Sequence, residues 1–142
     1  MTARIERPLS PHLQIYRVTL TMARSIIHRA TGIGLYFGTL LFAWWLIAAA
    51  SGPGAYANVQ AFTGSIIGKL IVFGYTWALM HHLCSGIRYF FWDLGYGFKP
   101  NEREALTWGA LIAGISLTVL ACTLAYTAGR ARSALPPPCA PR

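Results

Sequence analysis

Two adjacent histidines, His81 and His82, lie inside an apolar stretch, where an ionisable side chain is a candidate for function. If the helix that carries them ends near Asp93, His82 lies 11 residues inside it, about 16 Å from that end. An imidazole at that depth must bind a metal, pair with another group or line a cavity. A neutral histidine that is hydrogen-bonded to a neighbouring helix is the plainer interpretation.

The residues after His82 favour the first of these possibilities. Ser85 and Gly86 lie at i+3 and i+4, so the same helix face carries only small side chains one turn further on. A flat macrocycle such as haem needs that clearance to lie against a helix. Because His81 points about 100° away, both histidines cannot ligate one iron from the same side. Periodicity alone does not choose between them, and Gly86 favours His82.

A second cluster stands where the preceding apolar stretch begins. Ser25, His28 and Arg29 are spaced i, i+3 and i+4, which puts a hydroxyl, an imidazole and a guanidinium on one helix face. The cluster can be an interfacial anchor, or a polar pocket for a carbonyl or carboxylate ligand with Arg29 as a permanent donor. We place His28 at the membrane boundary and His82 near its middle. That difference in depth predicts that one haem is not ligated by both, so a second ligand would come from another subunit.

Composition indicates the elements that hold these residues. Of 142 residues, 55% are hydrophobic and 11% are charged, against about 25% charged in an average soluble domain. Too few charges remain to cover a soluble surface, so we expect a small integral membrane protein. The net charge is +8, but the basic residues border apolar stretches, which favours membrane anchoring over a nucleic-acid partner.

Three apolar spans predict three transmembrane helices, at about 25–50, 65–92 and 106–128. Turn-forming residues follow the first span, and a polar segment separates the second from the third. The expected fold is an all-α membrane protein. We expect residues 1–24 to form a cytoplasmic or interfacial N-terminal arm without a cleavable signal peptide, residues 25–128 to form the transmembrane domain, and residues 129–142 to form a proline-rich flexible tail.

The distribution of lysine and arginine predicts the orientation of the chain. Eight of these residues lie on the side of the N-terminal arm and four lie on the other side. The positive-inside rule therefore puts the N-terminus in the cytoplasm. We expect a bacterial inner-membrane protein that is inserted by its own helices.

Two stretches together resemble the cytochrome b556 subunits of succinate dehydrogenase, the large membrane anchors of respiratory complex II. The first is RPLSPHL at 7–13 with SIIHRATG at 25–32, and the second is HLCSGIR at 82–88 with WDLG at 92–95. The family pattern is RP…SxxHRxTG on the first helix and HxxxGIRH…D on the second. Either motif alone is moderately specific, and both in this order form a strong match over residues 7–95.

The resemblance implies a function and a set of site residues. The chain would be a haem b-binding anchor, not catalytic alone, in a heteromeric helix bundle with a small anchor subunit, an iron–sulfur subunit and a flavoprotein subunit. His82 matches the axial haem ligand, and His28 and Arg29 match residues near the haem propionates. Ser25, Ile26 and Arg29 match positions at the ubiquinone site. The small anchor subunit would supply the second axial histidine.

Departures from the family pattern and other functions stay open. Tyr89 stands where the pattern has histidine, and we assign it no role; Arg88 and Asp93 are expected at the interface or at a docking surface. The alternatives that keep the fold are a fumarate reductase-type anchor and a haem-free structural anchor. A small transporter with His81, His82 and Arg88 as a proton relay is disfavoured, because three helices do not divide into two repeats.

Overall fold

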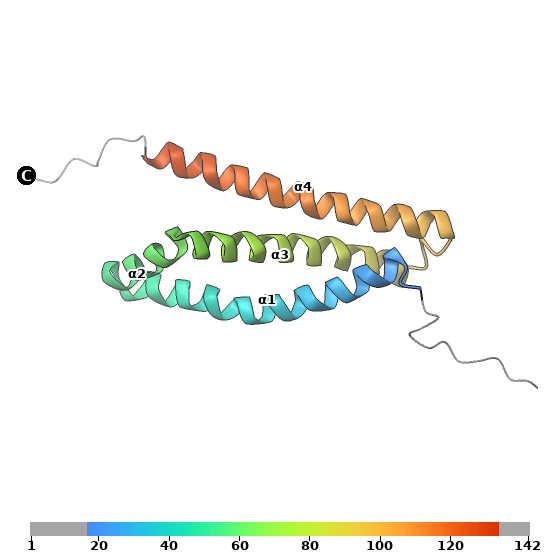
Figure 1. Cartoon of the computed structure of the whole chain (residues 1–142), viewed down its shortest axis with the longest axis horizontal. Coiled ribbons are helices and arrows are strands. Elements are labelled where there is room, and N and C mark those ends of the chain that lie inside the picture. Colours follow the sequence, from blue (N-terminus) through green and yellow to red (C-terminus); the bar gives the residue numbers. More distant parts are fainter. Residues whose placement is uncertain (1–16, 134–142) are drawn as a thin grey trace, which may run out of the picture.

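The computed structural model describes residues 17–133, which form four helices and no strand (Figure 1). The helices are α1 (Leu20–Ser51), α2 (Pro53–Gly64), α3 (Ile66–Asp93) and α4 (Pro100–Ser133). The expected all-α fold is therefore confirmed for the described part of the chain. The RPLSPHL motif at 7–13 and the end of the proline-rich tail, 134–142, lie outside the described residues.

Three of the helices are long and apolar enough to cross a membrane: Leu20–Ser51, Ile66–Asp93 and Pro100–Ala131. Even the shortest, α3 with 28 residues, extends about 42 Å, more than the roughly 30 Å of a hydrocarbon core. Many large apolar side chains on these helices are exposed, among them Ile47, Phe73 and Val119. Such a surface suits contact with lipid or with other membrane helices.

The helices extend beyond two of the three predicted spans. Helix α3 agrees with the prediction to within one residue, whereas α1 begins at Leu20 instead of 25 and α4 covers 100–133 instead of 106–128. Hydropathy marks the part of a helix that lies in lipid, but polar residues can continue the same helix beyond it. Pro100 suits the first turn of α4, because a proline lacks only a backbone N–H that is unpaired there anyway.

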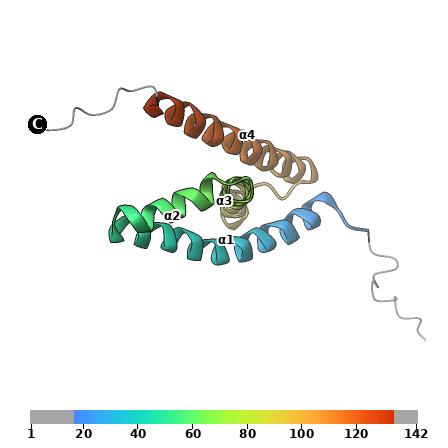
Figure 2. The ribbon, with the colours of Figure 1, turned by 60° about the vertical axis from the view of Figure 1, so that its left-hand side comes forward.

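The connection expected between the first two spans is itself helical. Gly52 adopts a φ of 116°, which favours glycine, and Pro53 then starts α2 in a new direction. At the other end, Ser65 caps α3, with its Oγ accepting a hydrogen bond from the Gly68 N–H at 3.0 Å. Helix α2 packs against both α1 and α3 at the end of the bundle away from the start of α1 (Figures 1 and 2).

Helix α3 is the central element of the bundle. It packs along both α1 and α4, while α1 and α4 touch over a shorter stretch, and Figure 2 shows α3 nearly end-on between them. The connection from α3 to α4 turns at Gly95 and Gly97, which have φ values of 86° and 84°. The start of α1, the end of α3 and the start of α4 therefore lie at the same end of the bundle (Figure 1).

Close packing between α3 and α4 depends on Gly114. This glycine is buried, and a Cβ built on it would lie 3.3 Å from the Cα of His81. Gly109, on the same helix, faces open space, since a Cβ there meets nothing within 4 Å. The two glycines thus differ in role, because Gly114 and not Gly109 lies where two backbones approach closely.

We expect Gly114→Leu to destabilise the bundle by about 1–3 kcal/mol, because the larger side chain must push α4 away from the backbone of α3. The measurement is the thermal unfolding of the detergent-solubilised protein. Gly109→Leu is the matched control, since it makes the same change on the same helix in open space. Equal losses of stability in the two variants would contradict the packing role of Gly114.

Candidate functional site

His28 on α1 and His82 on α3 are in direct contact. Their ring centroids lie 3.9 Å apart with an angle of 16° between the ring planes, so the rings are stacked. The prediction that they lie at different depths is therefore wrong. Because α1 begins at Leu20, His28 is already two turns inside its helix, at the level of His82.

Stacked rings do not act as two axial ligands of one iron. Axial histidines point at the metal from opposite faces of a macrocycle, whereas the faces of His28 and His82 contact each other and leave no room for a macrocycle between them. The expectation that one haem is not held by both histidines thus agrees with the geometry, although the reason given for it from depth was incorrect.

The surroundings of His82 determine which of its nitrogens is free. Its Nδ1 lies 3.2 Å from the carbonyl oxygen of His28, and a carbonyl can only accept a hydrogen bond. The proton is therefore on Nδ1, and Nε2 has an available lone pair. No described residue is hydrogen-bonded to Nε2. This arrangement, with one nitrogen tied to a carbonyl and the other free, is typical of histidines that bind metals.

Two glycines leave space around the His82 ring. A Cβ on Gly32 of α1 would lie 3.0 Å from Cε1 of His82, so glycine at this position lets the ring lie close to α1. One turn after His82, a Cβ on Gly86 would meet nothing within 4 Å. The helix surface beside His82 is therefore open, as the sequence analysis expected for a residue that faces a flat ligand.

His81 has a different environment. Its side chain is 1% exposed, its ring stacks on Trp77 with 5.4 Å between centroids, and its Nε2 lies 3.5 Å from the Ser85 hydroxyl. The backbone of His81 also lies against Gly114 of α4. His81 is thus part of the contact between α3 and α4 and offers no open face to a ligand.

Arg24 joins all three long helices. Its guanidinium on α1 donates from Nη1 to the Thr107 carbonyl on α4 and from Nη2 to the Ser85 hydroxyl on α3, the latter at 3.0 Å. The side chain is 2% exposed. Although Arg24 is one of the basic residues at the border of the first apolar stretch, its side chain turns into the bundle.

Arg88 is buried at the same level of the bundle as Arg24, and both residues contact Thr107. It is 2% exposed, donates to the Thr107 hydroxyl at 3.2 Å and lies over the rings of Tyr89 and Trp92, 4.9 Å and 4.5 Å from their centroids. Its Nε and Nη2 have no hydrogen-bond partner in the described part of the chain. The Arg88 side chain is therefore buried within the bundle, where aromatic faces instead of water cover its charge.

The residues predicted for the quinone site are less buried than Arg24 and Arg88. Ser25 is half-buried and accepts a hydrogen bond from the Tyr89 hydroxyl at 3.4 Å. Ile26 is 61% exposed. Arg29 is exposed and has no hydrogen bond or ion pair to any residue in 17–133. The structure therefore joins Ser25 to α3, while the side chains of Ile26 and Arg29 point away from the helices of this chain.

The sequence analysis assigned no role to two residues that make contacts in this region, Thr107 and Tyr89. Thr107 was overlooked because threonine is common in membrane helices and no motif covers it. Tyr89 was noticed only as a departure from a family pattern. The one available signal was spacing: Arg88 and Tyr89 lie seven residues after His81 and His82, so each continues the helix face of its histidine.

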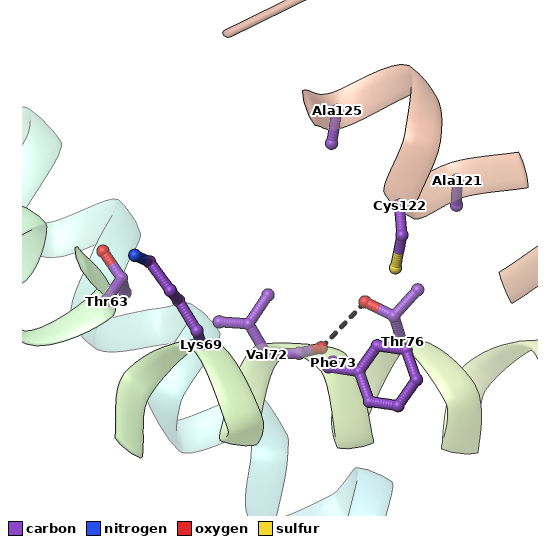
Figure 3. Close-up of a pocket in the computed structure, with 8 residues that line it drawn as sticks. All are labelled: Thr63, Lys69, Val72, Phe73, Thr76, Ala121, Cys122 and Ala125. Carbon is purple, nitrogen blue, oxygen red and sulfur yellow. Dashed lines mark hydrogen bonds between the residues drawn. The ribbon is translucent and has the colours of Figure 1, made fainter. Parts of the chain in front are cut away.

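A pocket near the other end of α3 has few polar groups that are free to bind a ligand (Figure 3). It measures about 320 Å³ and lies between α3 and α4, and its lining residues on α3, from Lys69 to Thr76, all precede the stacked His82 by at least six residues. The Thr76 hydroxyl donates to the Val72 carbonyl at 2.8 Å, and the Thr63 hydroxyl donates to the Val59 carbonyl at 2.9 Å. Lys69 supplies a cation beside mostly apolar walls, and the hydroxyls are already occupied.

Comparison with known families agrees with the motifs. The model of the family described as "Succinate dehydrogenase/Fumarate reductase transmembrane subunit" matches residues 3–122. This match includes both histidine clusters and most of α4.

Individual proteins are similar over most of the chain. The succinate dehydrogenase cytochrome b556 subunit of Paracoccus denitrificans is 41% identical over 114 residues, which cover 80% of this chain and 88% of that protein. The subunit of the same name from Rickettsia prowazekii is 40% identical over 118 residues, covering 81% and 90%. The mitochondrial succinate dehydrogenase cytochrome b560 subunit of Bos taurus is 41% identical over 121 residues, covering 82% and 68%.

We expect Thr107→Ala to cost about 1–3 kcal/mol of stability, because it removes the only hydrogen bond that the structure gives the buried Arg88 guanidinium. Unfolding of the detergent-solubilised protein measures this loss. The control is Thr123→Ala, also on α4, where the exposed hydroxyl bonds only to a carbonyl of its own helix. If both variants unfold alike, the contact between Thr107 and Arg88 does not stabilise the bundle.

Proposed function

Because the chain belongs to the succinate dehydrogenase/fumarate reductase transmembrane subunit family, we propose that it is the haem b-binding anchor of a succinate dehydrogenase. Its relatives are named as cytochrome b subunits of that enzyme, in bacteria and in mitochondria. In this role the chain holds a flavoprotein subunit and an iron–sulfur subunit at the membrane together with a small anchor subunit. The activity belongs to the assembly, succinate:quinone oxidoreduction, and not to this chain alone.

The geometry of His82 carries the proposal of a haem ligand. Its Nδ1 is tied to the His28 carbonyl, its Nε2 is free, and Gly86 leaves the helix surface beside it open. These features fit an axial ligand of a macrocycle. Bound haem supplies a one-electron store whose potential depends on its ligands and its burial. Within this chain, the hydrogen bond from Nδ1 sets the orientation of the ring and leaves the lone pair of Nε2 free.

We assign the haem propionates to His28 and Arg29. His28 packs on His82, and its Nδ1 is buried without a hydrogen-bond partner among the described residues. Arg29 follows it in sequence and has an exposed guanidinium that can pair with a carboxylate. The stacked rings leave only one of the two histidines for the iron, which supports a second axial ligand from the small anchor subunit.

Ser25, Ile26 and Arg29 form the proposed ubiquinone pocket. Ser25 and Arg29 are one turn apart on α1, with Ser25 half-buried beside Tyr89 and Arg29 exposed, and the exposed Ile26 offers an apolar wall for the quinone ring. Ser25 donates a hydrogen bond to a quinone carbonyl, and Arg29 stabilises the negative charge that develops on the oxygen during reduction. The quinone enters from the bilayer, since Ile26 and Arg29 face away from the bundle and Ser25 is only half-buried.

The orientation follows from the same arrangement. The start of α1 and the connection from α3 to α4 share one end of the bundle, and the excess of basic residues on these segments supports a cytoplasmic location for that end (Figure 1). The pocket then faces the side on which the catalytic subunits dock. For a bacterial protein, the membrane is the inner membrane.

Replacing the proposed ligand tests the haem assignment. In the purified complex, we expect His82→Leu to weaken or shift the b-type α-band in the reduced-minus-oxidised spectrum. His81→Leu is the matched control and should keep the band, because His81 is buried against Trp77 and α4.

The outcomes separate three possibilities. A band that is lost in His81→Leu but kept in His82→Leu would reverse the assignment of the ligand. A band that is kept in both variants would place the ligands in partner chains. No band even in the unsubstituted complex would leave a haem-free anchor.

Removing the Ser25 hydroxyl tests the quinone pocket. We expect Ser25→Ala to lower quinone reduction about tenfold or more, because a hydrogen bond to a charged oxygen contributes about 1.5–3 kcal/mol. Succinate oxidation with an artificial dye should continue at the normal rate. Ser51→Ala, at the far end of α1, is the control, since that hydroxyl donates to the Ile47 carbonyl at 2.7 Å. Equal loss of both activities in Ser25→Ala would refute the assignment.

A further inference from the structure

We propose that Tyr89 is a positioning residue of the quinone pocket: its hydroxyl donates to Ser25 Oγ and thereby directs the Ser25 hydrogen toward the quinone carbonyl. The inference rests on the proposed function, in which Ser25 contacts the quinone. It gives a role to a residue of α3 that is tyrosine in this chain, at a position where the family pattern has histidine.

The Ser25 hydroxyl differs from three other hydroxyls on α1 that are bonded to their own helix. Thr31, Thr39 and Ser51 each donate to a carbonyl three or four residues earlier in the helix, at 2.9, 2.5 and 2.7 Å. Ser25 makes no such bond to the described chain, and its one side-chain contact is the hydrogen bond that it accepts from Tyr89 at 3.4 Å. Since a hydroxyl has one hydrogen and two acceptor sites, the Ser25 hydrogen is still available for a ligand.

Tyr89 is itself held in place by three neighbours. Its ring lies 5.2 Å from the His28 ring and 5.5 Å from the Trp92 ring, centroid to centroid, and the Arg88 guanidinium lies 4.9 Å from its centroid. Arg88 is bonded in turn to Thr107 on α4. The direction of the Tyr89 hydroxyl is therefore set by the buried core of the bundle.

This support matters when the quinone is reduced. Negative charge grows on the carbonyl oxygen, and a donor that already points there stabilises the charge without first having to reorient. If Tyr89 becomes phenylalanine, the Ser25 hydroxyl can rotate and donate to a carbonyl of its own helix, as serine commonly does. The Ser25 hydroxyl then has to break its bond to the helix carbonyl before it can donate to the quinone.

The first test uses Tyr89→Phe in the purified complex. We expect kcat/KM for a short-chain ubiquinone to fall about three- to tenfold, the effect of one neutral hydrogen bond. The KM for succinate, the dye-linked rate and the haem spectrum should stay unchanged. Tyr96→Phe is the control, because Tyr96 lies near the same end of the bundle with 69% exposure and no hydrogen bond from its side chain to a described residue. An unchanged kcat/KM in Tyr89→Phe would overturn the inference.

A double-mutant cycle separates positioning from a general structural effect. If Tyr89 acts through Ser25, Tyr89→Phe should change kcat/KM by less than about twofold when Ser25 is already alanine. The dissociation constant of a redox-inert quinone analogue, measured by equilibrium binding, should follow the same pattern. Equal effects of Tyr89→Phe with and without the serine hydroxyl would overturn the inference.

The same cycle distinguishes the two proposals. A normal quinone reduction rate in Ser25→Ala would overturn the proposed quinone site, and this inference with it. A large loss in Ser25→Ala together with a neutral Tyr89→Phe would overturn the role of Tyr89 alone and leave the quinone site supported.

Discussion

The arrangement of this bundle depends on the burial of two guanidinium groups among membrane-spanning helices. A charge in such a place is costly unless it is solvated by the protein. The only ion pair in the described part of the chain joins Lys99 and Glu102, so neither Arg24 nor Arg88 has a carboxylate partner there. Arg24 is solvated by Ser85 and Thr107, and Arg88 by Thr107 and two aromatic faces. These contacts exist in only one register of α1, α3 and α4.

That register determines which residues meet further along the helices. His28 lies one turn after Arg24 on α1, and His82 lies one turn before Ser85 on α3. Since α1 and α3 run in opposite directions, the contact of Arg24 with Ser85 brings the two histidines to the same level, where they stack. The neighbouring pair, Ser25 and Tyr89, meets by the same alignment. The contacts of Arg24 with α3 and α4 thus set the geometry of residues that Arg24 itself does not touch.

The polar residues of α3 are divided between two faces with different roles. His81, Ser85 and Arg88 face α4 or the interior, where they are buried and engaged with the protein. His82, Gly86 and Tyr89 follow them by one position and lie on a face that is less buried and less engaged. Residues that hold the bundle together are therefore one position away in the sequence, and about 100° around the helix, from those to which we assign contacts with haem and quinone.

Much of this protein is determined by its sequence alone. Length and hydropathy predict three membrane helices, because apolar stretches of this length are stable only when they span lipid or are buried. The spacing of Ser25, His28 and His82 indicates the family and the candidate site. Hydropathy does not mark where a helix continues into polar residues, so the early starts of α1 and α4 and the whole of α2 were missed.

Only the tertiary structure decided how the side chains of these helices pair. That Arg24 and Arg88 turn inward, that His28 lies level with His82 and that Tyr89 reaches Ser25 all depend on the rotation and register of helices. These contacts join residues 54 to 83 positions apart in the chain, apart from that of Arg88 with Thr107. A local pattern fixes which residues share a helix face, but the packing of whole helices determines what that face meets.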